Sequence, residues 1–216
     1  MPSKSKYKLD ENIFKIINTN EKAYWLGFIF GDGSVDKTRL RISLSIQDEK
    51  HLIKFRDFLK SDHILTYDNR GCVTISISSS TLIKDLHQYG IIKNKTYLTN
   101  KLPLLSNDLF LYFVLGLLDS DGWITEHKLK KQKSQFEFGF SNYHNEILLE
   151  IKNWISNQLN KNVGYISTRE NKCPQLIIGG NNNFINLYNL FYKKYNYFTL
   201  DRKREKANIA YMQLYN

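Results

Sequence analysis

Two short segments of the chain read alike, and each ends in an aspartate followed by glycine. The first is WLGFIFGDG (25–33), and the second is VLGLLDSDG (114–122). In each segment an apolar, helix-like run leads to an acid, Asp32 in the first and Asp121 in the second. Paired carboxylates serve acid–base chemistry or hold a hard divalent cation. An acid presented twice by one chain therefore predicts a pseudo-symmetric site that contains two carboxylates.

Small residues lie on one face of each motif segment. Gly27 and Gly31 are four residues apart, and Gly116 and Ser120 repeat this spacing. Residues four apart share a helix face, so these stripes allow two helix backbones to approach closely. Packing through the stripes would bring the C-terminal ends of both helices, and their acids, together. The simpler interpretation is two buried core helices ending in ordinary Asp-Gly turns. Two copies at matched positions argue against it.

The residues after the first motif predict alternating strands and helices. Segment 38–46 alternates apolar residues with arginine and serine, which is typical of a strand with one buried and one polar, basic face. Helical spacing of apolar residues follows at 52–59. A second hairpin turns at 69–71 and continues in an alternating strand at 73–78, and another periodic helix covers 82–89.

The second half repeats this order. Alternation returns at 135–141, helical spacing at 147–155, a strand at 176–178, and the last periodic helix at 184–191. The sequence therefore predicts an α/β (α+β) protein with two halves, 1–100 and 101–216, each reading α-β-β-α-β-β-α.

Composition limits the class of protein and its partner. Hydrophobic residues make up 42% and aromatic residues 14% of the chain, which indicates a globular protein. The net charge of +10, from 31 Lys and Arg against 21 Asp and Glu, favours a polyanionic partner such as nucleic acid. A merely basic soluble protein is the alternative interpretation.

The two cysteines, Cys72 and Cys173, have no zinc-site spacing. We expect reduced thiols in a strand core and an intracellular protein, whether in an organelle, a phage host or a bacterial cytoplasm. No apolar run approaches the roughly 18 residues of a membrane span, and the first residues lack a secretory signal.

The motif pair and the repeated strand–helix order resemble the LAGLIDADG homing endonucleases in their single-chain, two-motif form. The resemblance covers nearly the whole chain. It implies antiparallel sheets that form a DNA-binding saddle, with the motif helices packed at the centre. It also implies intron homing by a metal-dependent double-strand break with short 3′ overhangs at a long asymmetric site. Double-stranded DNA would be the partner, with intron RNA as a further one, and the protein would be a monomer without membrane association.

The resemblance also assigns roles to individual residues. The final acid of each motif, Asp32 and Asp121, corresponds to the metal-binding catalytic carboxylate of the family. The carbonyls of the small residues before them assist, and two or three Mg²⁺ ions are expected, one of them shared between the two acids. The residues implied for this site are Gly31, Asp32, Ser120 and Asp121 for metal binding, and Asp32, Asp121, Lys95 and Lys203 for catalysis.

The lysines come from segments late in each repeat, where family members place a basic residue near the scissile phosphates. A solvated loop lysine and an ordinary basic tail are the simpler interpretations of Lys95 and Lys203. The family's earlier motif acid corresponds to Phe30 in the first copy and to Asp119 in the second. Because members vary at this position, Asp119 is not counted as catalytic.

Base recognition is expected from the polar strand faces, which would enter the major groove. A solvated sheet face is the alternative for any single residue. The two faces carry different residues, which predicts an asymmetric target. The candidates are Arg39, Arg41, Ser43, Arg70, Thr74, Ser76 and Ser78 in the first half, and Lys131, Lys133, Gln135, Glu137, Arg169 and Gln175 in the second.

Rival functions fit the residues less well. An EF-hand fails because the glycine after 119–121 comes too early for a calcium loop. An aspartic protease also pairs acids across a pseudo-dyad, but its Asp-Thr/Ser-Gly order is absent and the charge of +10 suits it poorly. The alternative that stays open is an RNA maturase, or a DNA-binding regulator of the same family that has lost cleavage. The presence of both motif acids favours a nuclease.

Overall fold

Two similar halves make up the protein, each with an antiparallel four-stranded sheet. The computed structural model describes residues 7–128, 133–170, 172–194 and 196–215. The elements of the first half are α1 (Asn20–Asp32), β1 (Ser34–Val35), β2 (Arg39–Ser45), a 3₁₀ turn (Ile46–Asp48), α2 (Glu49–Phe58), β3 (Thr66–Tyr67), β4 (Cys72–Ser78), α3 (Ser80–His87) and α4 (Lys95–Leu98).

The second half follows the same order with longer outer strands. Its elements are α5 (Asn107–Asp121), β5 (Gly122–His127), β6 (Gln135–Ser141), α6 (Asn145–Gln158), β7 (Tyr165–Ser167), β8 (Gln175–Gly179), α7 (Asn181–Phe191) and α8 (Asp201–Tyr215). The strand orders are β1-β2-β4-β3 and β5-β6-β8-β7. The α+β class and the repeated order are confirmed. The boundary expected at residue 100 falls between α4 and α5 and stays a prediction.

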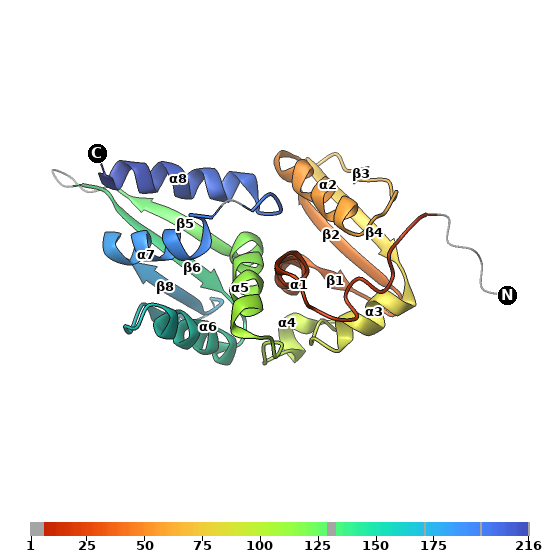
Figure 1. Ribbon diagram of the computed structural model, residues 1–216, viewed down its shortest axis with the longest axis horizontal. Coiled ribbons are helices and arrows are strands. Elements are labelled where there is room, and N and C mark those ends of the chain that lie inside the picture. Colours follow the sequence, from red (N-terminus) through yellow and green to blue (C-terminus); the bar gives the residue numbers. More distant parts are fainter. Residues whose placement is uncertain (1–6, 129–132, 171, 195, 216) are drawn as a thin grey trace.

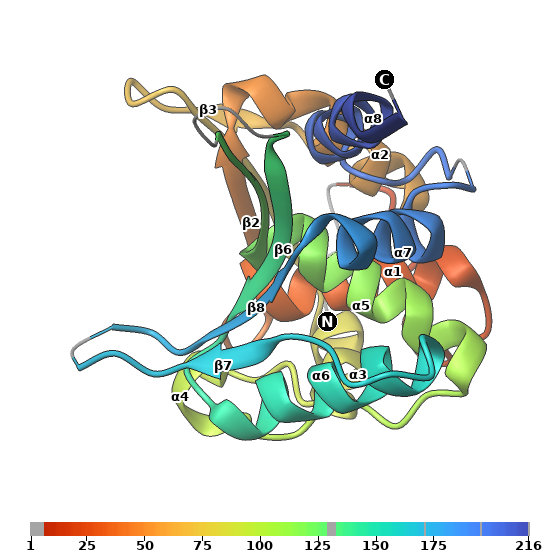
Figure 2. The same cartoon turned by 90° about the vertical axis from the view of Figure 1, so that its left-hand side faces the viewer.

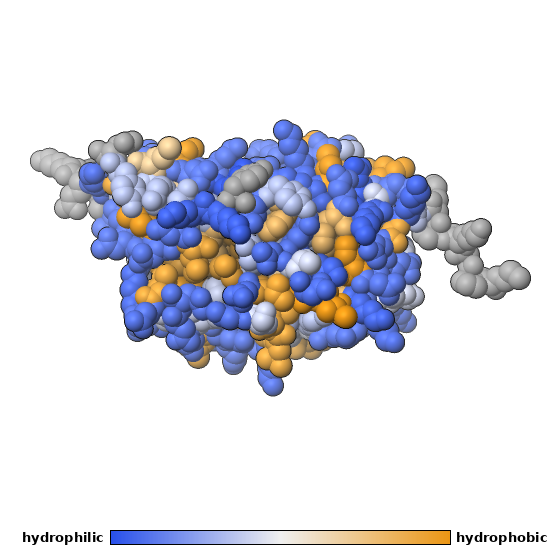
Figure 3. Space-filling view, viewed as in Figure 1, coloured by the Kyte–Doolittle hydropathy of each residue, from blue (hydrophilic) through white to orange (hydrophobic). Residues whose placement is uncertain are grey.

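The motif helices α1 and α5 lie side by side at the centre, and one sheet extends from each (Figure 1). Turning the molecule shows the strands on one side and the helices on the other (Figure 2). The side chains of the strands facing the helices are buried, as at Leu40, Ile75 and Phe138. The helix-covered side is mostly hydrophilic, with separate apolar areas (Figure 3). The sheets therefore present their polar faces together, opposite the helices.

Local sequence accounts for where the motif helices begin and end. Thr19 caps α1, and its side-chain oxygen accepts a hydrogen bond from the Lys22 N–H at 3.2 Å. At the other end the Gly33 N–H donates to the Ile29 carbonyl at 2.9 Å, and the chain turns into β1. Gly122 ends α5 in the same way: its N–H donates to the Leu118 carbonyl, and the chain continues into β5. Each motif acid is therefore the last residue of its helix.

Two expectations need correction. The cysteines do not lie in a strand core: Cys72 is half-buried and Cys173 is exposed. Alternation explains Cys72, because the next residue, Val73, occupies the buried face of β4. The helix at 184–191 is not the last one, since α8 follows it. The buried residues of α8 are Lys203, Ala207 and Ala210, whereas its Ile209 and Met212 are exposed, so no stripe of large apolar residues marks the inner face of this helix.

Among the described residues, no helix has both the length and the apolar character needed to cross a membrane.

Candidate active site and nucleic-acid interface

The interface between α1 and α5 is a backbone-to-backbone contact through the small residues. A Cβ atom placed on Gly27 would lie 2.0 Å from the Phe113 carbonyl oxygen. One placed on Gly116 would lie 2.0 Å from the Tyr24 carbonyl oxygen. Neither oxygen can rotate away, because both belong to helix backbone. The prediction of close packing through the small-residue stripes is confirmed.

This packing brings the two motif acids to one place. Asp32 ends α1 and Asp121 ends α5, and both side chains are largely buried. Burial, together with the charge of Asp121, raises the pKa of Asp32 to about 6. Burial also raises the pKa of Asp121 above its usual range. Two partly buried carboxylates held together favour a positive charge beside them.

Lys95 lies in this site rather than in solvent. It begins the short helix α4, and its Nζ donates a hydrogen bond to the Gly31 carbonyl at 2.8 Å. Burial lowers the pKa of Lys95, while the carboxylates of Asp121 and Asp32 oppose this shift. A cavity of about 180 Å³ opens beside it, with Asp121 and Cys173 also in its wall.

Lys203 is held more tightly than Lys95. Its buried ammonium donates to three carbonyl oxygens: Leu118 at 2.7 Å, Ser120 at 3.1 Å and Gly122 at 2.6 Å. Burial lowers the pKa of Lys203 to about 8, against the attraction of nearby carboxylates. The three carbonyls surround the end of α5, where the last carbonyls of a helix lack the N–H partners of a further turn; the Leu118 carbonyl also accepts from the Gly122 N–H. Lys203 therefore completes this helix end as well as placing a charge beside the acids.

The lysines and the acids are paired across the two halves. Among the charged groups, Lys95 of the first half has the largest effect on the pKa of Asp121. Among the positive groups, Lys203 of the second half has the largest effect on the pKa of Asp32. Each lysine also donates a hydrogen bond to the carbonyl that precedes the acid of its own half, Gly31 for Lys95 and Ser120 for Lys203. Both lysines therefore affect both acids, and the site exists only where the two halves meet, so the sequence of one half could not have revealed it.

Asp119, which the sequence left without a role, is a fully buried hydrogen-bonding centre. Its Oδ2 accepts from the Tyr24 hydroxyl at 2.7 Å and from the Leu200 N–H at 2.9 Å. Its Oδ1 accepts from the Tyr192 hydroxyl at 2.8 Å. These bonds join α1, α5 and the residue that precedes α8. A lone acid inside an apolar helical run was the only signal of this centre in the sequence.

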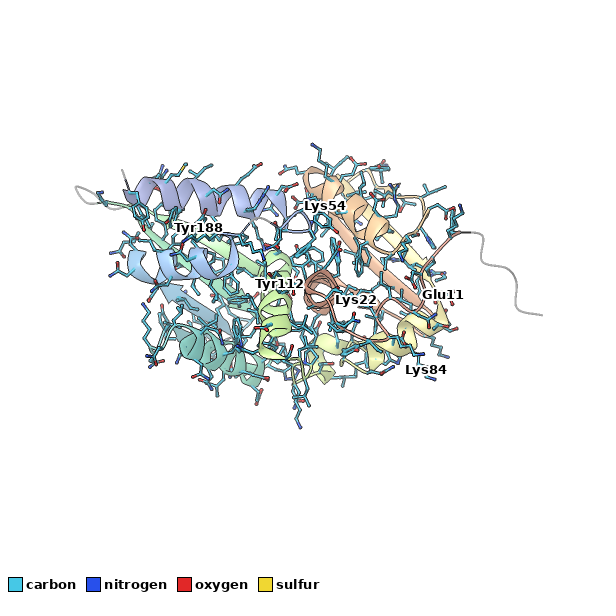
Figure 4. All side chains as sticks on the ribbon, in the orientation of Figure 1. Glu11, Lys22, Lys54, Lys84, Tyr112 and Tyr188 are labelled. Atoms are coloured by element: carbon cyan, nitrogen blue, oxygen red, sulfur yellow. The ribbon has the colours of Figure 1, made fainter. Side chains whose placement is uncertain are left out.

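The start of α8 is also held by ion pairs from the first half. Lys54 Nζ donates to the Asp201 carboxylate at 2.9 Å and to the Thr199 carbonyl at 3.0 Å. Figure 4 shows Lys54 on α2 where the two halves adjoin, near the start of α8. Arg202 donates to both carboxylate oxygens of the buried Asp48, at 3.1 and 2.9 Å. These contacts fix the turn that delivers Lys203 to the acids.

Replacing Asp119 by alanine should destabilise the protein strongly. The substitution leaves the Tyr192 hydroxyl and the Leu200 N–H buried without their acceptor, and Tyr24 keeps only His51 as a partner, which we expect to lower the free energy of unfolding by about 3–5 kcal/mol. Urea unfolding followed by tryptophan fluorescence measures the loss.

Asp119→Asn is the matched variant, because it retains one carbonyl oxygen and should cost only about 1–2 kcal/mol. Equal stability of Asp119→Ala and the parent protein would contradict the role of Asp119 as a hydrogen-bonding centre.

Solved structures of LAGLIDADG homing endonucleases are similar to this chain. The structure of the I-LtrWI LAGLIDADG homing endonuclease bound to target DNA matches with a TM-score of 0.61 at 13% identity, over 95% of this chain and 92% of that one. I-SmaMI bound to an uncleaved DNA target with calcium ions matches with a TM-score of 0.61 at 12% identity, over 92% of each chain. The LAGLIDADG meganuclease I-AabMI bound to uncleaved DNA gives 0.60 at 14% identity, over 89% of this chain and 90% of that one.

The chain has the LAGLIDADG homing-endonuclease fold. No protein-family sequence model matches the chain, and no curated protein matches it by sequence. The likeness is therefore one of structure, at sequence identities of 12–14%.

In this LAGLIDADG fold, the first sheet presents a polar and basic face. Arg39, Arg41 and Ser43 of β2 are exposed and pair in register with Ser78, Ser76 and Thr74 of β4. The hydroxyls of Ser43 and Thr74 lie 2.7 Å apart. Six of the seven expected contact residues of this half thus share one surface. Arg70 lies apart, at the turn between β3 and β4, where it forms an ion pair with Asp68 at 2.9 Å.

The expected DNA-contact residues of the second half do not all lie on one sheet face. Gln135 and Gln175 are exposed on the face opposite the core, and Lys133 and Arg169 are exposed in neighbouring loops. Lys131 falls outside the described residues. Glu137 shares the face but is tied down: the Trp123 Nε1 donates to it at 3.2 Å, and His127 pairs with it at 3.0 Å. Whether any of these residues contacts DNA stays a prediction.

Proposed function

We propose that this protein is a site-specific DNA endonuclease that makes a metal-dependent double-strand break at a long asymmetric target. The observation that supports this most directly is the meeting of two partly buried motif acids, Asp32 and Asp121, with two lysines at the junction of the halves. Proteins of the same fold are described as homing endonucleases bound to target DNA. Because both acids and both lysines belong to one chain, we propose that it acts as a monomer.

The donor atoms at the site suit a hard cation. Two carboxylates and the neighbouring carbonyls of Gly31 and Ser120 offer only oxygen, the ligand preferred by Mg²⁺ and Ca²⁺. Within the described residues no group of three or more His, Cys, Asp or Glu side chains could hold a metal. Mg²⁺ keeps several waters and binds substrate phosphates, so few protein ligands suffice. A calcium-containing complex of I-SmaMI is consistent with divalent ions in this fold.

We place two or three Mg²⁺ ions here, held by Asp32 and Asp121, with one ion shared between these acids. Bound metal would supply stabilisation of charge on the attacking and leaving oxygens of the phosphodiester.

The lysines would stabilise the phosphates of the two strands. Lys95 and Lys203 both lie close enough to the two acids to lower their pKa values, so the site combines two carboxylates with two ammonium groups. A buried ammonium interacts strongly with phosphate because little water screens it. Their bonds to carbonyl oxygens hold both side chains in fixed positions before DNA arrives. We propose that these two lysines offset the developing phosphate charge, one on each strand.

The polar faces of the sheets would bind the duplex. The net charge of +10 favours phosphate contacts, and exposed Arg39 and Arg41 suit guanine edges in the major groove.

Cleavage of a randomised-site plasmid library tests the proposal. In the presence of Mg²⁺ we expect linear product with short 3′ overhangs from plasmids that share one long site, and no product with EDTA. Enrichment of bound DNA without cutting would overturn the nuclease assignment and favour a non-cleaving regulator. Binding of structured RNA in place of DNA would favour a maturase.

Affinity for the divalent ion should depend on pH through Asp32. The raised pKa of about 6 means that this carboxyl is largely protonated at pH 5 and largely ionised at pH 7. A cation binds the ionised form, so affinity should rise about tenfold per pH unit below pH 6 and level off above it. Calorimetric titration with Ca²⁺, which avoids turnover, measures this. Asp32→Asn should lose the step near pH 6, and a step that persists in this variant would contradict the assignment.

A further inference from the structure

The two sheet faces differ in chemistry at equivalent positions. In the first sheet, Ser34 of β1 pairs with Arg41 of β2, which pairs with Ser76 of β4. We call these three residues the polar row. Ser34 comes directly after the first motif, and Trp123 comes directly after the second. We call the cross-strand row of the second sheet that contains Trp123 the apolar row. It runs across all four strands and consists of Trp123, Gly139, Ile177 and Tyr165.

Trp123 is fixed across the sheet rather than projecting from it. A Cβ atom on Gly139 would lie 2.1 Å from the indole Cζ2 of Trp123, so the ring occupies the space above the glycine. The indole N–H donates to Glu137 at 3.2 Å, and His127 holds the other oxygen of Glu137 at 3.0 Å. The ring is therefore preordered, and its polar atom is already satisfied by the protein.

The remaining members of the row keep it apolar toward the outside. Ile177 is half-buried and Tyr165 is 60% exposed, and both lie on the face opposite the core. An ordered apolar surface of this kind costs free energy when it is left in water. It therefore points to an apolar group on the molecule that covers this face.

The apolar row is continuous with the candidate active site. Trp123 is two residues after Asp121, and Ser141 on the same face of β6 donates its hydroxyl to the Asp121 carbonyl at 3.3 Å. Exposed Gln135 and Gln175 lie on this face beside the row. A DNA duplex that lies over the motif acids, as in the proposed function, would therefore also cover the Trp123 end of the row.

We propose that the apolar row reads thymine methyl groups in the half of the target that lies on the second sheet. In the major groove the C5-methyl of thymine is the apolar group that a base pair presents, and apolar side chains recognise it. The polar row has the opposite preference, since Arg41 suits the O6 and N7 acceptors of guanine. The inference rests on the proposed function and adds the chemistry by which each half-site is read.

Selection of binding sites from randomised duplexes, followed by deoxyuridine substitution, tests the proposal. Deoxyuridine removes the methyl and leaves the base pairing intact. Arg41→Ala assigns the half-sites, because it should relax selection only in the half that lies on the first sheet. In the other half, each deoxyuridine opposite the apolar row should weaken binding about fourfold, equivalent to roughly 0.8 kcal/mol per buried methyl.

Protein variants provide the complementary test. Ile177→Val removes one carbon and keeps a β-branched strand residue, so it should fold, weaken the thymine preference in the second half and leave the first half unchanged. Ile177→Thr should weaken that preference further. A second half-site without thymine, or with full affinity for deoxyuridine, would overturn the inference while leaving the proposed nuclease intact. Failure to select any site would overturn the nuclease proposal and this inference together.

Discussion

Replacing Asp32 or Asp121 by asparagine is expected to abolish double-strand cleavage while DNA binding remains. The amide keeps the size of the side chain but removes the negative charge that would hold the divalent ion. Loss of metal-derived charge stabilisation, worth several kcal/mol, corresponds to a fall of at least about 10³-fold in rate. Single-turnover cleavage of a selected site, beside an equilibrium binding measurement on the same duplex, separates the two effects.

Asp57→Asn is the matched control for these variants, because Asp57 is an exposed acid on α2 that pairs with its neighbour Arg56 on the protein surface. Its cleavage rate should stay within about twofold of the parent protein, as expected for a weak surface ion pair. Parent-like cleavage by either Asp32→Asn or Asp121→Asn would refute the metal-site assignment. Loss of DNA binding in both variants would instead assign the acids to DNA affinity.

Gly116→Ala is expected to destabilise the protein severely. The added Cβ would lie 2.0 Å from the Tyr24 carbonyl oxygen and 2.8 Å from the Phe28 nitrogen. Because both atoms are helix backbone, the helices must separate to relieve the contact. Overpacking ordinarily costs about 1–3 kcal/mol, and we expect about 3 kcal/mol or more here. Urea unfolding measures this loss, and cleavage should fall with it because the two acids separate.

Gly179→Ala controls for the loss of glycine itself. Gly179 ends β8, and a Cβ there would meet its nearest neighbour, the Cβ of Glu137, at 3.9 Å, an ordinary contact. This variant should change the free energy of unfolding by no more than about 0.5 kcal/mol. If Gly116→Ala proved as stable as Gly179→Ala, close packing of the motif helices would not be what holds the halves together.

Gly27→Ala provides an independent check from the other helix. Its Cβ would lie 2.0 Å from the Phe113 carbonyl oxygen, so the predicted loss resembles that of Gly116→Ala. The double variant should cost less than the sum of the single ones, since one separation of the helices relieves both contacts.

The sequence by itself determined the local structure and the position of the acids along it. Alternation in 39–45 and 135–141 is a property of neighbouring residues, and both segments are strands whose apolar residues face the core. Four-residue spacing of small residues likewise predicted which faces of α1 and α5 would meet. These predictions succeeded because strand and helix periods are set by backbone geometry within a few residues.

Tertiary structure alone decided how distant residues combine. Lys203 meets three carbonyls around the end of α5, and Asp119 joins two tyrosines from separate elements, because the halves pack together. Gly139 is covered by Trp123 from the adjacent strand, a pairing that depends on sheet register. Buried polar groups must find partners wherever packing places them. Those partners, unlike a periodic pattern, leave no regular spacing in the sequence.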